Sequence, residues 1–247
     1  MKAFGTHFKT ELKLSLRGMD MVIFAICMPI VVMVILGIIY GSKPAFDGAS
    51  YSFLEQSFGA VAAIAVCAGG VMGLPLVVSD YRNKKILKRF KVTPVSPTMI
   101  LLVQVAIYTL YAVVSLLLVY ITVRLFFGSS FGGSWLQFLG AYLLVMLSMF
   151  SIGMLVGGVS KDVKTAQLLC CVLYFPMLIF SGTTLPYEVM PKALQKVADF
   201  MPLTQGIKLL KVTSLGLSTD GVLLPIIVMA ALAVLCIGVS IRFFRWE

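Results

Sequence analysis

Six long stretches without a charged side chain constrain the fold of this chain more than any other feature. They run from Met21 to Ser42, Gln56 to Ser79, Val92 to Val123, Leu125 to Ser160, Thr165 to Tyr187 and Gly221 to Ile241. A helix needs about 20 apolar residues to cross a bilayer. Trimmed at prolines and polar ends, the stretches predict six transmembrane helices. Their expected ranges are about 21–40, 57–79, 98–123, 135–160, 165–182 and 222–241.

The composition agrees with a lipid environment. Only 12% of the residues are charged, 60% are hydrophobic and the mean hydropathy is +1.03, whereas a soluble domain is about a quarter charged. The alternating ten-residue pattern of a lipid-facing β-strand does not occur. The sequence therefore predicts an all-α membrane protein with a single transmembrane domain over residues 1–247.

The first apolar stretch is expected to be retained as a span. It follows twenty polar-leaning residues, is too long for the core of a signal peptide and lacks a small-x-small cleavage site.

The distribution of Lys and Arg predicts the orientation. With six spans, fourteen of these residues fall on the side of the two termini: Lys2, Lys9, Lys13, Arg17, Arg82, Lys84, Lys85, Lys88, Arg89, Lys91, Lys161, Lys164, Arg242 and Arg245. Six fall on the other side: Lys43, Arg124, Lys192, Lys196, Lys208 and Lys211. Because positive residues concentrate in cytoplasmic segments, both termini are expected in the cytoplasm. The net charge of +10 is thus mainly a topology signal. A nucleic-acid-binding function is excluded, since no basic domain stands outside the membrane.

The first twenty residues form a candidate interfacial helix. An apolar residue recurs every fourth position, at Phe4, Phe8, Leu12 and Leu16, beside a parallel basic stripe. Such a helix suits the surface of the inner leaflet. Two interpretations remain open: a simple interfacial anchor, or an elbow that leads into the first span and touches a cytoplasmic partner.

The segment between the second and third spans predicts a second short helix, at 82–92. Its basic face would carry Arg82, Lys85 and Arg89, and its apolar face Ile86, Leu87 and Phe90. Pro94 would end it, because the residue before a proline is disfavoured in a helix. Ser96 and Pro97 are suited to start the next span. A basic loop held by anionic lipid is one explanation; a partner protein that covers the apolar face is the other.

The stretch from 181 to 220 is too polar to span a membrane. We expect two amphipathic helices at 186–213, the first beginning at Pro191 and stopped by Pro202, and the second capped by Thr204 and ending near Lys211. Both would dip into or lie on the outer leaflet. Irregular backbone at that depth requires protein or water to cover it.

The sequence contains no motif for catalysis or for an energy source of its own. It has no G-x-x-x-x-G-K-[ST] phosphate loop, and no Asp, Glu, Lys, Arg or His falls inside the six expected spans. His7 is the single histidine, and the five cysteines lack metal-ligand spacing. We therefore expect no catalytic residue, metal or cofactor on this chain. A transporter of this kind would depend on another protein for its energy.

Two motifs resemble those of one known family. The sequence LKRFKVTPVSPTMILLVQ at 87–104 looks like the first cytoplasmic loop of type-2 ATP-binding-cassette (ABC) export permeases. The sequence FSGTTLPYEVMPKALQKVADFMPLTQGIKLLK at 180–211 is similar to the family's outer segment. The chain departs from the pattern at Val103-Gln104, where a Gly-Lys pair is common.

The resemblance implies the membrane subunit of an ABC exporter. Such a permease dimerises, as a homo- or heterodimer, and each copy docks on a separate ATPase subunit that binds ATP and Mg. The segment at 82–92 would be the coupling helix that contacts the ATPase. The outer re-entrant motif would comprise Ser181, Gly182, Pro186, Pro191, Pro202, Leu203 and Thr204.

The expected function is ATP-driven export of an amphiphilic substrate, such as a drug, lipid or peptide, with polysaccharide as a further alternative. The expected location is the cytoplasmic membrane of a prokaryote. A self-sufficient secondary transporter or channel and a non-transporting membrane scaffold are the competing interpretations.

Overall fold

A computed structural model of the chain describes residues 2–41, 43–45, 49, 51–86, 97–128, 131–181, 190–217 and 221–243. Within these residues the protein is helical, and the only strand-like pairing is an isolated bridge between Pro44 and Ser52. Six helices are long and apolar enough to cross a membrane: Ile23–Tyr40, Phe53–Asn83, Thr98–Phe127, Trp135–Val159, Val163–Phe180 and Leu223–Arg242. The predicted fold class and the six spans are confirmed.

The elements follow one another along the chain with short connections. The first part comprises α1 (Lys2–Gly18), α2 (Asp20–Val22), η1 (Ile23–Cys27), α3 (Met28–Tyr40), α4 (Phe53–Cys67), η2 (Ala68–Gly73) and α5 (Leu74–Asn83). The second part comprises α7 (Pro97–Phe127), α8 (Trp135–Val159), α9 (Val163–Phe180), α10 (Lys192–Phe200), α11 (Pro202–Leu215) and α12 (Leu223–Phe243).

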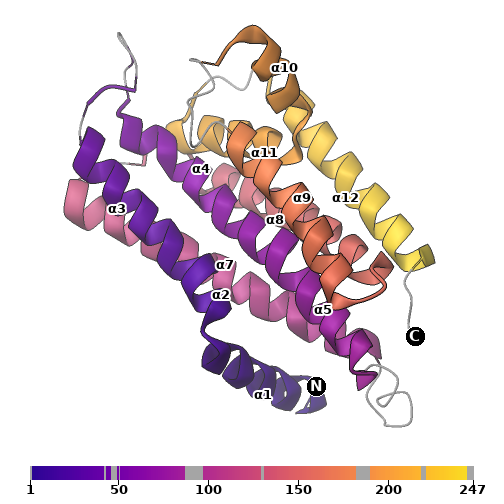
Figure 1. The fold of residues 1–247 in the computed structure, drawn as a ribbon. Coiled ribbons are helices and arrows are strands. Elements are labelled where there is room, and N and C mark those ends of the chain that lie inside the picture. Colours follow the sequence, from indigo (N-terminus) through magenta and orange to yellow (C-terminus); the bar gives the residue numbers. More distant parts are fainter. Residues whose placement is uncertain are drawn as a thin grey trace.

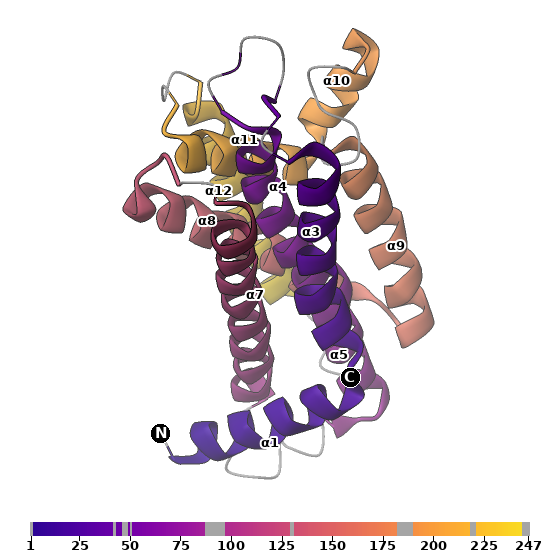
Figure 2. The same ribbon diagram turned by 90° about the vertical axis from the view of Figure 1, so that its left-hand side faces the viewer.

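The ends of the helices fall into two groups. Helix α1 lies across one end of the bundle, where the end of α5 also lies (Figures 1 and 2). Helices α10 and α11 lie at the opposite end. The basic residues that α1 and the end of α5 carry on the terminal side therefore lie at one end of the molecule.

Two spans are longer than the sequence suggested. The helix Phe53–Asn83 has 31 residues, or about 46 Å at 1.5 Å per residue, against a hydrocarbon core of about 30 Å. Glu55, Asp80 and Arg82 fall within its first and last turns, and Arg124 near the end of α7. These charged residues lie outside the expected ranges 57–79 and 98–123, because each helix continues past its apolar stretch.

Prolines in the first two spans follow short π-helical segments. Pro29 is the second residue of α3, directly after η1, and Pro75 is the second residue of α5, directly after η2. A proline has no N–H and its ring crowds the carbonyl four residues earlier. A wider π turn separates the proline ring from that carbonyl. Segments of π-helix are also frequent at functional sites.

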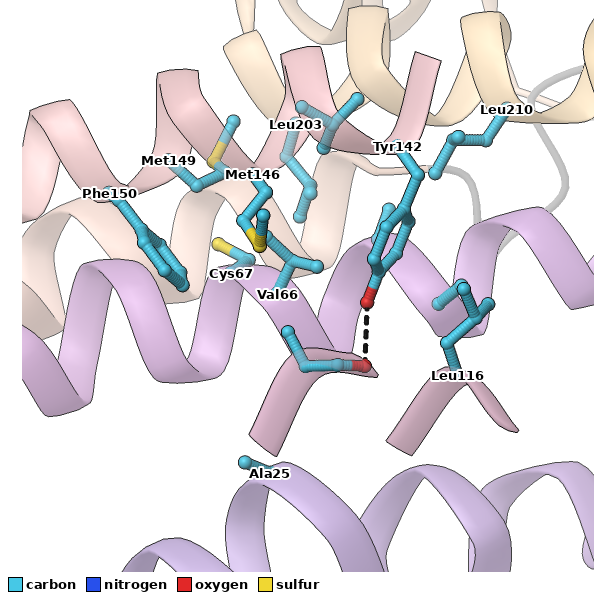
Figure 3. Close-up of a cluster of buried hydrophobic side chains, with 14 of the residues drawn as sticks. Ala25, Val66, Cys67, Leu116, Tyr142, Met146, Met149, Phe150, Leu203 and Leu210 are labelled. Atoms are coloured by element: carbon cyan, nitrogen blue, oxygen red, sulfur yellow. Dashed lines mark hydrogen bonds between the residues drawn. The ribbon is translucent and has the colours of Figure 1, made fainter. Parts of the chain in front are cut away.

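The centre of the bundle is a cluster of buried apolar side chains from α4, α8 and α11, with contributions from η1 and α7. Figure 3 shows Ala25, Val66, Cys67, Leu116, Tyr142, Met146, Met149, Phe150, Leu203 and Leu210. The hydroxyl of Tyr142 is buried among them and donates to the carbonyl oxygen of Ala112 at 2.8 Å. This bond satisfies a polar group that would otherwise be costly to bury.

Glycines allow α8 to approach the second span closely. A Cβ atom added to Gly153 would lie 1.9 Å from the carbonyl oxygen of Gly70 in η2. One added to Gly157 would lie 3.0 Å from Val78 and 3.1 Å from the backbone of Pro75. The G-x-x-x-G spacing is thus a packing seam between two helices.

This seam gives a test of the packing. We expect Gly153→Ala to destabilise the protein by about 1–3 kcal/mol, because the added methyl group overpacks the contact with Gly70. Gly140→Ala is the matched control in the same helix: its Cβ would have nothing within 4 Å. It should be neutral or stabilising by up to ~1 kcal/mol. Thermal unfolding in detergent measures both, and equal melting temperatures for the two variants would contradict the seam.

Candidate functional site

A half-open cavity of about 1020 Å³ lies among α1, α2, η1, α3, the long helix α4–η2–α5, α7 and α9, and some of its lining residues, such as Phe24 and Phe175, are exposed. Its volume is at the upper end of the range of about 300–1,000 Å³ typical of small-molecule sites. The cavity is the main candidate site within the described residues.

The walls of the cavity are mostly apolar. They come chiefly from the first, second and fifth spans, each of which contains a proline, and include Phe24, Met28, Met72, Tyr174, Phe175 and Leu178. Both π segments, η1 and η2, contribute residues to the lining, and Pro176 lies inside α9 between Phe175 and Leu178. The irregular helices of the bundle therefore meet around this cavity.

The end of the cavity that faces α1 is polar. It is lined by Glu11, Asp80, Tyr81 and Gln104. The Tyr81 hydroxyl donates to Oε2 of Glu11 in a short hydrogen bond. The side-chain amide of Gln104 donates to the same Oε2 and to the Tyr81 hydroxyl oxygen, both at 3.0 Å. We call these three residues the Glu11 junction; it joins α1 to α5 and α7.

A second polar contact fixes α1 one turn further on. The Tyr111 hydroxyl, from α7, donates to Oγ of Ser15 at 2.8 Å. Phe8 and Leu12 are half-buried and pack against the apolar core. Helix α1 is therefore attached to the bundle through a mixed face of polar and apolar side chains.

This attachment differs in part from the predicted apolar stripe. The stripe was expected to face the inner leaflet, whereas Phe8 and Leu12 pack against the bundle; Phe4 is 37% exposed and Leu16 is 46% exposed. The rings of Phe4 and Phe8 stack with their centroids 6.4 Å apart. The stripe is split because Glu11 and Ser15 also point to the bundle, where α5 and α7 supply them with donors.

Arg82 does not lie on the exposed basic face of a separate helix, as the sequence analysis expected. It belongs to α5, the end of the second span, and is 6% exposed. Its guanidinium Nη1 donates to the carbonyl oxygen of Gly158 at 2.9 Å. Because the last carbonyls of a helix lack partners within that helix, the end of α8 offers Arg82 both an acceptor and a favourable helix dipole.

The helix ends directly after this contact. Lys84 pairs with Asp80 at 2.8 Å, and Lys85 takes a left-handed backbone with φ of +55°. Lys85 is exposed and Ile86 is half-buried. Leu87, Arg89 and Phe90 lie outside the described residues, so the predicted coupling face stays a prediction.

The connection between α8 and α9 lies at the same end as the Arg82 contact. Asp162 caps α9 by accepting a hydrogen bond from the Thr165 backbone N–H at 2.7 Å. This bond lowers the pKa of the Asp162 carboxyl below its ordinary value.

At the opposite end, the segment after α9 forms the two expected helices, α10 and α11, and most of α11 is buried within the bundle. Leu203 and Thr204 are buried, and α11 packs against α4, α8 and α12. A Cβ added to Gly59 in α4 would lie only 3.0 Å from the backbone of Leu210. The polar backbone at this depth is therefore covered by protein.

The residues of the outer motif have partly different roles from those expected. Pro202 is the first residue of α11 rather than only a stop signal, and Thr204 does not cap it. The Thr204 hydroxyl instead donates to the carbonyl oxygen of Phe180 at 3.2 Å, and Ser181 donates to that of Leu178 at 2.7 Å. Pro191 is the residue before α10. Gly182 and Pro186 lie outside the described residues.

The Glu11 junction was not predicted from the sequence. Glu11 is the only acidic residue among the first nineteen, and Gln104 is one of few amides inside an apolar stretch. Those two isolated polar residues were the available signal, but their partners on other helices could not be read from it. Within the described residues no group of His, Cys, Asp and Glu side chains could hold a metal ion.

These features define a multi-pass helical membrane protein with a cavity among its spans. The sequence model of the ABC-2 type transporter family matches residues 2–215. The chain therefore belongs to the ABC-2 type transporter family.

A curated relative is similar over part of its length. Nodulation protein J of Rhizobium leguminosarum bv. viciae is 32% identical over 97 residues. This segment covers 39% of the present chain and 35% of that protein. The chain thus matches about a third of the relative.

The Glu11 junction gives a prediction for the attachment of α1. We expect Glu11→Ala to raise the amide hydrogen-exchange rates of α1 by about tenfold or more, since a hydrogen bond to a charged group is worth about 1.5–3 kcal/mol. Tyr111→Phe, which removes the contact with Ser15, should act in the same direction but less. Lys13→Ala, on the exposed side of α1, is the control and should leave exchange unchanged. Similar exchange in all three variants would contradict the attachment.

Proposed function

We propose that this permease is half of an ABC exporter that moves an amphiphilic substrate out of a prokaryotic cell. Two copies of such a subunit, identical or related, would work with separate ATPase subunits that bind ATP and Mg. The chain belongs to this family and contains a large cavity with apolar walls and one polar end. That cavity is the observation that carries the proposal. A substrate with an apolar part and a head group fits such a lining.

The ATPase contact is proposed at the segment after α5. This segment follows residues that are themselves fixed to the bundle, since Arg82 bonds to α8 and Tyr81 to α1. A push on the segment by an ATPase would thus reach the polar end of the cavity through the last turn of α5.

A first test concerns the energy source. The purified permease is expected neither to bind nor to hydrolyse ATP, and export by proteoliposomes should require the partner ATPase. ATP hydrolysis by the contaminant-free permease, or substrate movement driven by an ion gradient without the ATPase, would overturn the proposal in favour of a self-sufficient carrier.

A second test separates a coupling contact from a basic anchor. If Leu87 and Phe90 are covered by the ATPase, each contributes about 1.5–3 kcal/mol by burial. Leu87→Ser combined with Phe90→Ser should then abolish co-purification of the ATPase and export. Lys84→Gln combined with Lys88→Gln should have a smaller effect, because exposed charges contribute little individually. The opposite order would support the lipid-anchored loop, and membrane insertion should remain normal in both variants.

A third test addresses orientation. The clustering of basic segments at one end suggests that this end faces the cytoplasm. In a variant whose native cysteines are replaced, a cysteine at position 88 should be labelled only after permeabilisation, and a cysteine at position 192 without it. The reverse labelling pattern would invert the proposed topology.

A further inference from the structure

We propose that the cavity selects amphiphiles with a cationic head group, which is held at Glu11 and Asp80 while the apolar part lies against the walls. This inference rests on the proposed function, because it names the substrate class of the same cavity. It adds a sign of charge, which neither the family nor the cavity volume specifies.

The first argument is the charge of the lining. Among the described residues that line the cavity, the charged ones are Glu11 and Asp80, and no Lys, Arg or His is among them. Although the chain has a formal net charge of +10, the cavity is acidic. An anionic head would face two carboxylates, and like charges repel.

The second argument is the acceptor capacity of Glu11. Both hydrogen bonds of the Glu11 junction end on Oε2. The other oxygen, Oε1, lies 4.0 Å from Nε2 of His7, beyond hydrogen-bond range. Because a carboxylate has about four acceptor sites, Glu11 can hold α1 in place and still accept from a ligand in the cavity.

The third argument is the exchangeable partner of Asp80. Its contact with Lys84 joins side chains that are 35% and 63% exposed. A pair of this kind is only weakly stabilising. A ligand ammonium can therefore replace Lys84 at the carboxylate, and the displaced lysine returns to solvent.

The walls suit the remainder of such a ligand. Methionines such as Met28 and Met72 adapt to apolar groups of different shape, and Tyr108, Tyr174 and Phe175 supply aromatic rings to the lining. Aromatic faces attract cations and exclude anions. Both the acidic end and the aromatic walls thus favour the same sign of charge.

The test uses three probes with the same sixteen-carbon chain and a diazirine in that chain. Their head groups are an ammonium, a glucoside and a sulfate. The purified permease is placed in phosphatidylcholine nanodiscs without ATPase or ATP, and photolabelled residues are mapped by mass spectrometry. Labelling is measured against the amount of probe in the bilayer, so that unequal partitioning does not decide the result.

The ammonium probe should label cavity residues at the lowest concentration and the sulfate probe at the highest. In the double variant Glu11→Gln with Asp80→Asn, the half-saturating concentration of the ammonium probe should rise by about ten- to a hundredfold, the range expected for hydrogen bonds to charged groups. The glucoside should change little. Asp199→Asn, an acidic site on α10 outside the cavity lining, should change none of the three.

Tighter labelling by the sulfate or the glucoside in the wild-type permease would overturn the inference, as would an unchanged preference for the ammonium in the double variant. The wild-type series alone remains decisive if the double variant fails to fold. Because no ATPase is present, failure of ATP-driven export would leave a positive labelling result intact, and the two proposals can fail separately.

Discussion

The structure depends on the requirement that backbone polar groups within lipid find their hydrogen-bond partners inside the protein. Long helices meet this requirement by themselves. The π segments before Pro29 and Pro75 depart from the regular α-helix, and both contribute residues to the cavity lining. The same irregularity that accommodates a proline therefore shapes the wall of the candidate site.

Helices α8 and α11 pack against different parts of the bundle. On one side of α8, glycines bring it against the second span; on another, it packs along α12, where the Ser148 hydroxyl donates to the carbonyl oxygen of Met229. Helix α11 fills the far end. Neither α8 nor α11 lines the cavity. The second span does both: it packs against the glycines of α8 and contributes residues of α4, η2 and α5 to the cavity wall.

The span count and the positions of most helices could be predicted from sequence because lipid demands a continuous apolar length, which is a local property. The helices proved longer at polar ends, as at Glu55, where a capping box with Ser52 starts α4 four residues before the expected boundary. The contacts of the candidate site were harder to predict from the sequence. Arg82 looked like a surface charge because its acceptor, Gly158, lies 76 positions further along the chain. The burial of α11 was missed for the same reason, since its amphipathic pattern does not say whether protein or lipid covers the apolar side.

The contacts of Tyr81 and Arg82 have a mechanical consequence. Two consecutive residues of α5 are bound to different helices, Tyr81 to α1 and Arg82 to α8. The last turn of α5 consequently cannot rotate about its own axis without breaking one of the two contacts. Lys85, with its left-handed backbone, is the first position beyond them with a conformation that a non-glycine residue rarely adopts. The chain thus has a fixed pivot followed within three residues by a bend, so that displacement beyond the bend reaches the bundle as a tilt of α5 and not as a twist.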